Sequence, residues 1–168
     1  MTGEAARFLT RFAAAVAICA WVGGFMVYGG IVVPILDDAL GHFDAGMITR
    51  RVTNGLNAIG VVAVASGAGV AWVDRRLGTH IERALRLGLL ILSAASLATL
   101  AGLHAEMDRR LDSVGLRGFR PYHRAYLIVS TGQWLANLGL IALTVRIWTR
   151  SRCDSAPLIS SETRKDHA

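Results

Sequence analysis

The stretch FAAAVAICAWVGGFMVYGGIVVPIL, from Phe12 to Leu36, holds 25 residues and not one Asp, Glu, Lys or Arg. Three further stretches lack these charges: Val52–Val73, Leu87–Ala105 and Ala125–Val145, with 22, 19 and 21 residues. An α-helix rises 1.5 Å per residue, so roughly 20 apolar residues cross the hydrocarbon core of a bilayer, about 30 Å thick. The four stretches therefore predict four transmembrane helices.

The charged residues of the chain, 18 basic and 12 acidic, all lie outside these stretches. None of the stretches alternates polar and apolar residues as barrel strands do, and helices satisfy every backbone hydrogen bond within lipid. The pattern excludes a soluble enzyme domain, a disulfide scaffold and, despite a net charge of +6, a nucleic-acid module. The predicted fold is all-α, a polytopic membrane four-helix bundle with up-down topology.

The predicted bundle is one domain, residues 1–150, followed by a disordered cytoplasmic tail, residues 151–168, which is polar. Eleven Lys and Arg residues lie in the two terminal segments and the second link, and seven lie in the first and third links. Positive residues are enriched on the cytoplasmic side of membrane proteins. We therefore expect a protein of the bacterial inner membrane with both termini in the cytoplasm.

Helix boundaries follow from proline, glycine and tryptophan. Pro34 closes or kinks the first helix, and the next begins near Ala45. Gly118 and Pro121 are expected to interrupt the chain before the last helix. Trp72 and Trp148 lie where interfacial anchors occur, whereas Trp21 and Trp134 lie deeper and are expected to pack between helices.

A polar stripe marks the last predicted helix. His123, Tyr126, Ser130, Gln133 and Asn137 recur at steps of three and four, which places them on one face. The stripe either forms interhelical hydrogen bonds, worth about 0.6 kcal/mol each, or lines a polar cavity for a ligand or ion. With the natural partners on the second and third helices, the candidate cavity residues are Asn54, Asn57, Ser93, Ser96, Tyr126, Ser130, Gln133 and Asn137.

Three histidines, His42, His104 and His123, fall on the same side of the membrane in this topology. Together with the nearby Met47 and Met107, their imidazoles would suit copper, and a pair of them could ligate haem. No spacing such as H-x-x-H accompanies them. They are the candidate metal ligands, and the cofactor stays open between copper, haem and none.

Catalysis is disfavoured by the content of the spans. No acid lies inside any of the four charge-free stretches, and no Ser-His-Asp or Cys-His set is visible. Asp37 and Asp38, after Pro34, are the acids nearest the membrane on the histidine side, where a solvated link explains them as well as a cation site does.

The chain also resembles a known family. The run Trp21-Val22-Gly23-Gly24 followed by Pro34, with His123, Ser130 and Asn137 on the last helix, is similar to small four-helix membrane proteins of unknown function. That family is distantly similar to CopD-like copper-resistance membrane domains. The likeness spans about Phe8 to Trp148 and implies the four-span fold and the handling of a metal or small solute. The first span also resembles that of the four-helix protoporphyrinogen oxidase family, but it lacks that family's functional His.

The leading hypothesis is a non-enzymatic membrane protein whose polar cavity handles a metal ion or a small solute. The alternatives are a haem- or quinone-linked redox protein and a structural subunit of a membrane complex. In the redox alternative His104 and His123 are the ligands, and Arg109, Arg110 and Arg120 hold anionic groups. The expected partners are the lipid bilayer and either a second copy of the chain or a larger membrane complex, with no nucleic acid.

Overall fold

The computed structural model of the protein describes residues 3–114 and 116–154, with side chains at all of these except 42, 43, 108, 110–114, 116–120 and 152–154. The elements are α1 (Gly3–Val27), the π-helix η1 (Tyr28–Val32), α2 (Val33–Val73), α3 (His80–Val114) and α4 (Leu116–Asp154). Strands are absent from these ranges. The predicted all-α, four-helix fold is confirmed.

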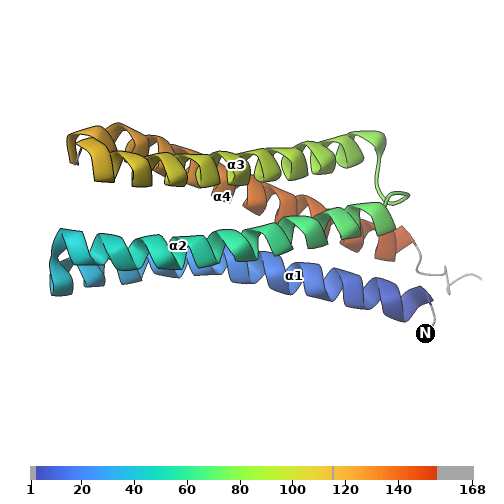
Figure 1. The fold of residues 1–168 in the computed structure, drawn as a ribbon. Helices are drawn as coiled ribbons and strands as arrows, with labels where there is room; N and C mark the ends of the chain where they lie inside the picture. Colours follow the sequence, from blue (N-terminus) through green and yellow to red (C-terminus); the bar gives the residue numbers. More distant parts are fainter. Residues whose placement is uncertain (1–2, 115, 155–168) are drawn as a thin grey trace, which may run out of the picture.

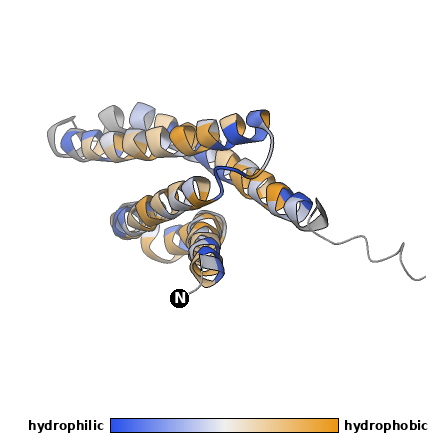
Figure 2. Cartoon of the chain, turned by 90° about the vertical axis from the view of Figure 1, so that its right-hand side faces the viewer, coloured by the Kyte–Doolittle hydropathy of each residue, from blue (hydrophilic) through white to orange (hydrophobic). Residues whose placement is uncertain are grey.

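Four segments are long and apolar enough to cross a membrane: Gly3–Gly41, Asp44–Val73, His80–Met107 and Pro121–Ser151. Large apolar side chains are widely exposed along them, and Ile128, Ile81 and Phe8 keep 74%, 73% and 66% of their surface. Figure 2 shows apolar residues along all four helices and hydrophilic ones at the α2–α3 link and at helix ends. Contiguous apolar surface on this scale is unstable in water and favourable in lipid, which identifies an integral membrane protein.

The first two spans are separated at a glycine. Gly41 has φ 77° and ψ 163°, a left-handed conformation that glycine adopts without steric cost. The second span starts at Asp44, one residue before the start near Ala45 that the sequence predicts. Pro34 lies in the first turn of α2, directly after η1. In a regular α-helix the Pro34 ring would crowd the carbonyl of Gly30. Gly30 lies in η1, where the turn is wider.

Helices α3 and α4 follow each other more closely than the sequence suggests. Gly118 and Pro121 do not break the chain, because α4 already begins at Leu116 and contains Pro121 near its start. Pro121 has no backbone N–H, and the hydrogen bond that it cannot form belongs to the second turn of α4. Its loss costs less there than in mid-helix. Helix α4 also continues to Asp154, into the segment predicted as a disordered tail, and residues 155–168 of that tail lie outside the described residues.

The helices form two antiparallel hairpins, α1 with α2 and α3 with α4, and the packing within each hairpin is more extensive than the packing between hairpins. Figure 1 shows the α2–α3 link, the start of α1 and the end of α4 at the same end of the bundle. Trp21, Ala63 and Leu97 form a buried cluster that joins α1, α2 and α3. A second cluster, Leu100, Met107 and Tyr126, joins α3 to α4.

Close approach of α1 and α2 depends on small residues. A Cβ atom at Gly60 would lie 2.5 to 2.7 Å from the Trp21 indole, and one at Gly24 would lie 2.8 Å from Leu56. Gly60 therefore needs to be glycine for the helices to pack at this distance, whereas a larger residue at Gly24 would require only the end of the Leu56 side chain to shift.

Candidate functional site

The polar stripe of α4 meets α3 inside the bundle. Ser93, Gln133 and Asn137 keep only 0%, 3% and 4% of their surface. The Ser93 hydroxyl donates to Asn137 Oδ1 at 2.8 Å, and Gln133 Nε2 donates to the Ser93 carbonyl at 3.1 Å. Lipid contains no water that could bond to these polar groups, so the three residues bond to one another. Three predicted cavity residues are thus brought together as one hydrogen-bonded group.

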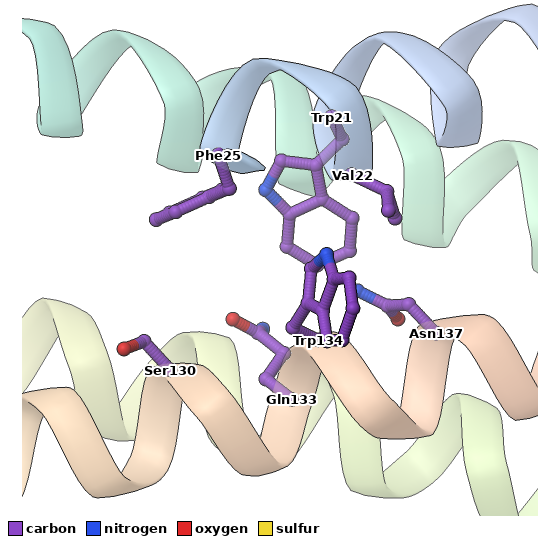
Figure 3. A pocket seen from close by; sticks show the side chains of 7 residues that line it. All are labelled: Trp21, Val22, Phe25, Ser130, Gln133, Trp134 and Asn137. Atoms are coloured by element: carbon purple, nitrogen blue, oxygen red, sulfur yellow. The ribbon is translucent and has the colours of Figure 1, made fainter. Parts of the chain in front are cut away.

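A small cavity lies beside this group, between α1 and α4. Its volume is about 10 Å³, room for about one water molecule. Figure 3 shows the Trp21 indole reaching from α1 toward Trp134 on α4, with the Gln133 amide oxygen directed into the space beside them. The lining residues are Trp21, Val22 and Phe25 of α1 and Ser130, Gln133, Trp134 and Asn137 of α4.

The indole nitrogens at this cavity have no hydrogen-bond acceptor. Trp21 Nε1 and Trp134 Nε1 are both buried, and neither finds a partner within the described part of the chain. A buried donor without an acceptor costs about 1 to 3 kcal/mol, and lipid offers nothing to replace the lost hydrogen bond. Two residues that line the cavity thus carry indole donors without an acceptor, and the Trp21 nitrogen lies on the side of the ring that packs against Gly60 of α2.

A second group of buried polar atoms surrounds Tyr126, one turn before Ser130 on α4. The Tyr126 hydroxyl and the Asn57 side chain of α2 lie within reach of each other, and His104 Nε2 of α3 has no hydrogen-bond partner among the described residues. The rings of His104 and Tyr126 are 6.2 Å apart between centroids and inclined at 58°. Polar groups of α2, α3 and α4 therefore lie outside the cavity lining, toward the end of the bundle opposite the α2–α3 link.

The remaining predicted cavity residues do not join these groups in the same way. Asn54 is exposed on α2, and Ser96 is half-buried on α3. Ser130 lines the cavity, but its hydroxyl donates to the Leu127 carbonyl of its own helix at 3.0 Å. Helical spacing placed Ser130 correctly, whereas the rotation of α2 about its axis, which decides where Asn54 points, cannot be read from the sequence.

The predicted metal ligands are only partly described. The His42 side chain lies outside the described residues, His104 is half-buried beside Tyr126, and His123 is exposed. Among the side chains that the structure describes, no three from His, Cys, Asp and Glu come together as a metal site would require. A copper or haem site at these histidines stays a prediction.

The sequence reasoning missed a buried ionic cluster at the end of the bundle where the α2–α3 link lies. The Asp74 carboxylate accepts from Arg11 Nη2 at 2.7 Å, Arg11 Nε at 3.1 Å and Trp148 Nε1 at 2.8 Å. Arg86 Nη2 donates to the carbonyls of Asp74 and Ala71 at 3.2 and 3.3 Å. Asp74, Arg11, Arg86 and Trp148, named here the Asp74 cluster, come from the end of α2 and from α1, α3 and α4.

The signal for this cluster was present but incomplete. Arg11 directly precedes the first charge-free stretch and Asp74 directly follows the second, so antiparallel spans place both at one membrane boundary. Seven other charged residues lie in the link from Asp74 to Arg86 or before Phe12, and spacing alone did not select the pair. Trp148, predicted to be an interfacial anchor, donates its indole N–H to Asp74. Exposed Trp72 has Arg75 stacked 4.8 Å from its ring centroid, an arrangement that suits the interface.

Comparison of the chain with protein-family models, with curated proteins and with solved structures finds no match.

Proposed function

We propose that this integral membrane protein binds a small neutral solute, one that both donates and accepts hydrogen bonds, between its two helical hairpins. The observation that carries the proposal is that two residues lining one cavity, Trp21 and Trp134, each hold a buried indole nitrogen without a hydrogen-bond partner among the described residues. A solute oxygen that accepts from either indole would recover hydrogen-bond energy that the empty site forgoes. The carbonyl side of the Gln133 amide supplies the complementary acceptor.

The residues at the cavity favour a neutral solute over an ion. Its lining contains indole, amide, hydroxyl and apolar side chains and no charged one. A charged solute buried among these groups would lack a counter-charge, which is expensive at membrane depth. Indole N–H groups, moreover, donate hydrogen bonds and do not coordinate cations, so the unpaired atoms suit a carbonyl or hydroxyl compound.

Access to the cavity is proposed from the end of the bundle opposite the Asp74 cluster. Tyr126, Asn57 and His104 place buried polar atoms in that direction, whereas the Asp74 cluster ties the helices together at the other end. A solute larger than water requires the hairpins to separate around the cavity. The sparser packing between hairpins than within them is consistent with such a movement.

For the setting of this function we propose the bacterial inner membrane, with both termini in the cytoplasm. The support is the excess of Arg and Lys, eleven against seven, on the side of the termini. In a background with Cys19 and Cys153 replaced by serine, an Asp44→Cys variant in intact cells should react with a membrane-impermeant maleimide added from outside. Reaction only after the cells are opened would invert the orientation.

Acrylamide provides a direct test, because it is a small neutral amide that quenches tryptophan fluorescence on contact. In nanodiscs, and in a Trp72→Phe background that removes the exposed indole, we expect acrylamide to quench Trp21 and Trp134 with a saturable component. Iodide, an anion, should not reach these two residues. Ser130→Leu, which fills the cavity, should abolish the saturable component.

Thr131→Leu is the matched control. Thr131 is the neighbour of Ser130, is exposed, and donates to the same Leu127 carbonyl at 2.8 Å, so it loses the same local hydrogen bond without filling the cavity. Quenching that rises linearly with acrylamide in all variants, or that falls equally in Ser130→Leu and Thr131→Leu, would disprove a solute site here.

A further inference from the structure

A second, larger cavity lies outside the solute site, between the start of α1 and the end of α4. Its volume is about 470 Å³, within the range of cavities that hold organic ligands. It is lined by Glu4, Arg7, Phe8, Arg11, Phe12 and Ala15 of α1 and by Trp148 of α4. We call it the α1–α4 groove.

The groove residues of α1 are ordered by depth. They occupy positions 4, 7, 8, 11, 12 and 15, where each residue has another of the set three or four positions away, so they form one stripe that runs from the end of the bundle into the span. Glu4 is outermost, Arg7 follows about 4.5 Å further along the helix axis at 1.5 Å per residue, and Phe8, Phe12 and Ala15 lie deeper. From water into lipid, the groove therefore presents first a carboxylate, then a guanidinium and then apolar surface.

One charged residue of the groove forms an ion pair with another described residue, and the other two do not. Arg11 is bound to Asp74 at 2.7 Å, and its guanidinium lies 5.3 Å from the Trp148 ring centroid. Arg7 and Glu4 are exposed, and within the described chain neither forms an ion pair. Arg7 Nε donates to the Gly3 carbonyl, which leaves its terminal nitrogens available. One cation and one anion are thus presented to a ligand.

We propose that the α1–α4 groove binds a phospholipid whose headgroup carries a phosphate and a primary ammonium, as phosphatidylethanolamine does. The phosphate pairs with Arg7, the ammonium reaches outward to the Glu4 carboxylate, and an acyl chain lies along Phe8, Phe12 and Ala15. In such a lipid the ammonium is further from the acyl chains than the phosphate, the same order as Glu4 and Arg7 along α1.

The charge balance selects this class of lipid. Because Asp74 already neutralises Arg11, the two unused charges sum to zero and match a zwitterion. An anionic phospholipid without an amine would leave the Glu4 carboxylate beside its phosphate, an unfavourable like-charge contact. A choline headgroup carries the positive charge but has no N–H to donate to Glu4.

Native mass spectrometry of the delipidated protein in detergent tests the proposal. The protein is titrated with palmitoyl-oleoyl phosphatidylethanolamine, phosphatidylglycerol or phosphatidylcholine, which share their acyl chains. We expect the ethanolamine lipid to bind about fivefold more tightly than the other two, the scale of one exposed ion pair. Soluble phosphoethanolamine, which has no acyl chains, should not displace it at equal concentration.

Variants separate the two contacts. Glu4→Gln should make the ethanolamine and glycerol lipids bind equally, and Arg7→Gln should weaken all three by about fivefold. Arg76→Gln is the control, because Arg76 is an exposed arginine in the α2–α3 link, at the same end of the bundle but outside the groove. Equal binding of the three lipids, preference for phosphatidylglycerol, displacement by phosphoethanolamine, or equal effects of Arg7→Gln and Arg76→Gln would overturn the proposal.

Discussion

At the scale of single residues, the side chain of Asp74 matters most for the stability of the described protein. Its side chain is 1% exposed, and its carboxylate binds donors from α1 and α4. Its partner Arg11 is 30% exposed, so water screens part of that charge. A buried carboxylate with this many donors is well compensated, whereas removal of one charge leaves the other in a poor environment.

Replacement of Asp74 by Asn should lower the free energy of unfolding by about 2 kcal/mol, less than for a fully buried pair because Arg11 is partly hydrated. Equilibrium unfolding in detergent micelles measures the change. Asp44→Asn, which alters an exposed carboxylate at the start of the second span, should stay within about 0.5 kcal/mol of the parent. Equal losses in the two variants would contradict a stabilising role for the Asp74 cluster.

The same residues show what the sequence could and could not predict. The period of three and four placed Gln133 and Asn137 on one inward face, because a polar amide in lipid must find a partner. The same reasoning did not place Asn54, which is exposed, or pair Arg11 with Asp74. Depth along a span follows from counting residues, but rotation of one helix against another depends on packing that no local pattern encodes.

At the scale of elements, the charge-free stretches located the spans but not the ends of the helices. Helices α3 and α4 contain 35 and 39 residues, longer than the 19 and 21 of their charge-free stretches. Charged residues are good helix formers outside the lipid, so the helices continue past the membrane until a capping signal stops them. A capping signal also marks the start of α3. There the backbone N–H of Thr79 donates to the Glu82 carboxylate, and the backbone N–H of Glu82 donates to Thr79 Oγ1.

Contact between α1 and α2 depends on Gly60. A methyl group there would lie 2.5 Å from the Trp21 ring, which is backed by Ala63 and Leu97 and cannot move freely. We expect Gly60→Ala to destabilise the fold by about 1 to 3 kcal/mol through overpacking and to shift the Trp21 fluorescence. Gly55→Ala, on the same helix with open space around it, should be neutral or stabilising. Similar effects of the two substitutions, measured by thermal unfolding, would refute this contact.

At the scale of the whole molecule, two hairpins are held together at one end by the Asp74 cluster and enclose polar groups further along. The sequence predicted the four spans and a polar interior, and the structure adds that the interior is divided between satisfied and unsatisfied groups. Ser93, Gln133 and Asn137 satisfy one another, whereas Trp21 and Trp134 do not find acceptors. The satisfied groups fix the packing of α3 on α4, and the unsatisfied ones define where a solute would bind.

If the cavity between Trp21 and Trp134 receives polar molecules, water should reach the indole N–H groups there. Magnetisation transfer from water to the four indole N–H groups can be recorded on protein labelled with nitrogen-15 tryptophan in nanodiscs. We expect transfer to Trp21 and Trp134 that Ser130→Leu abolishes, with Trp72 as the exposed positive control and Trp148, bound to Asp74, giving little signal. Transfer to Trp72 alone would mean that the cavity is dry, and would contradict the proposed solute site.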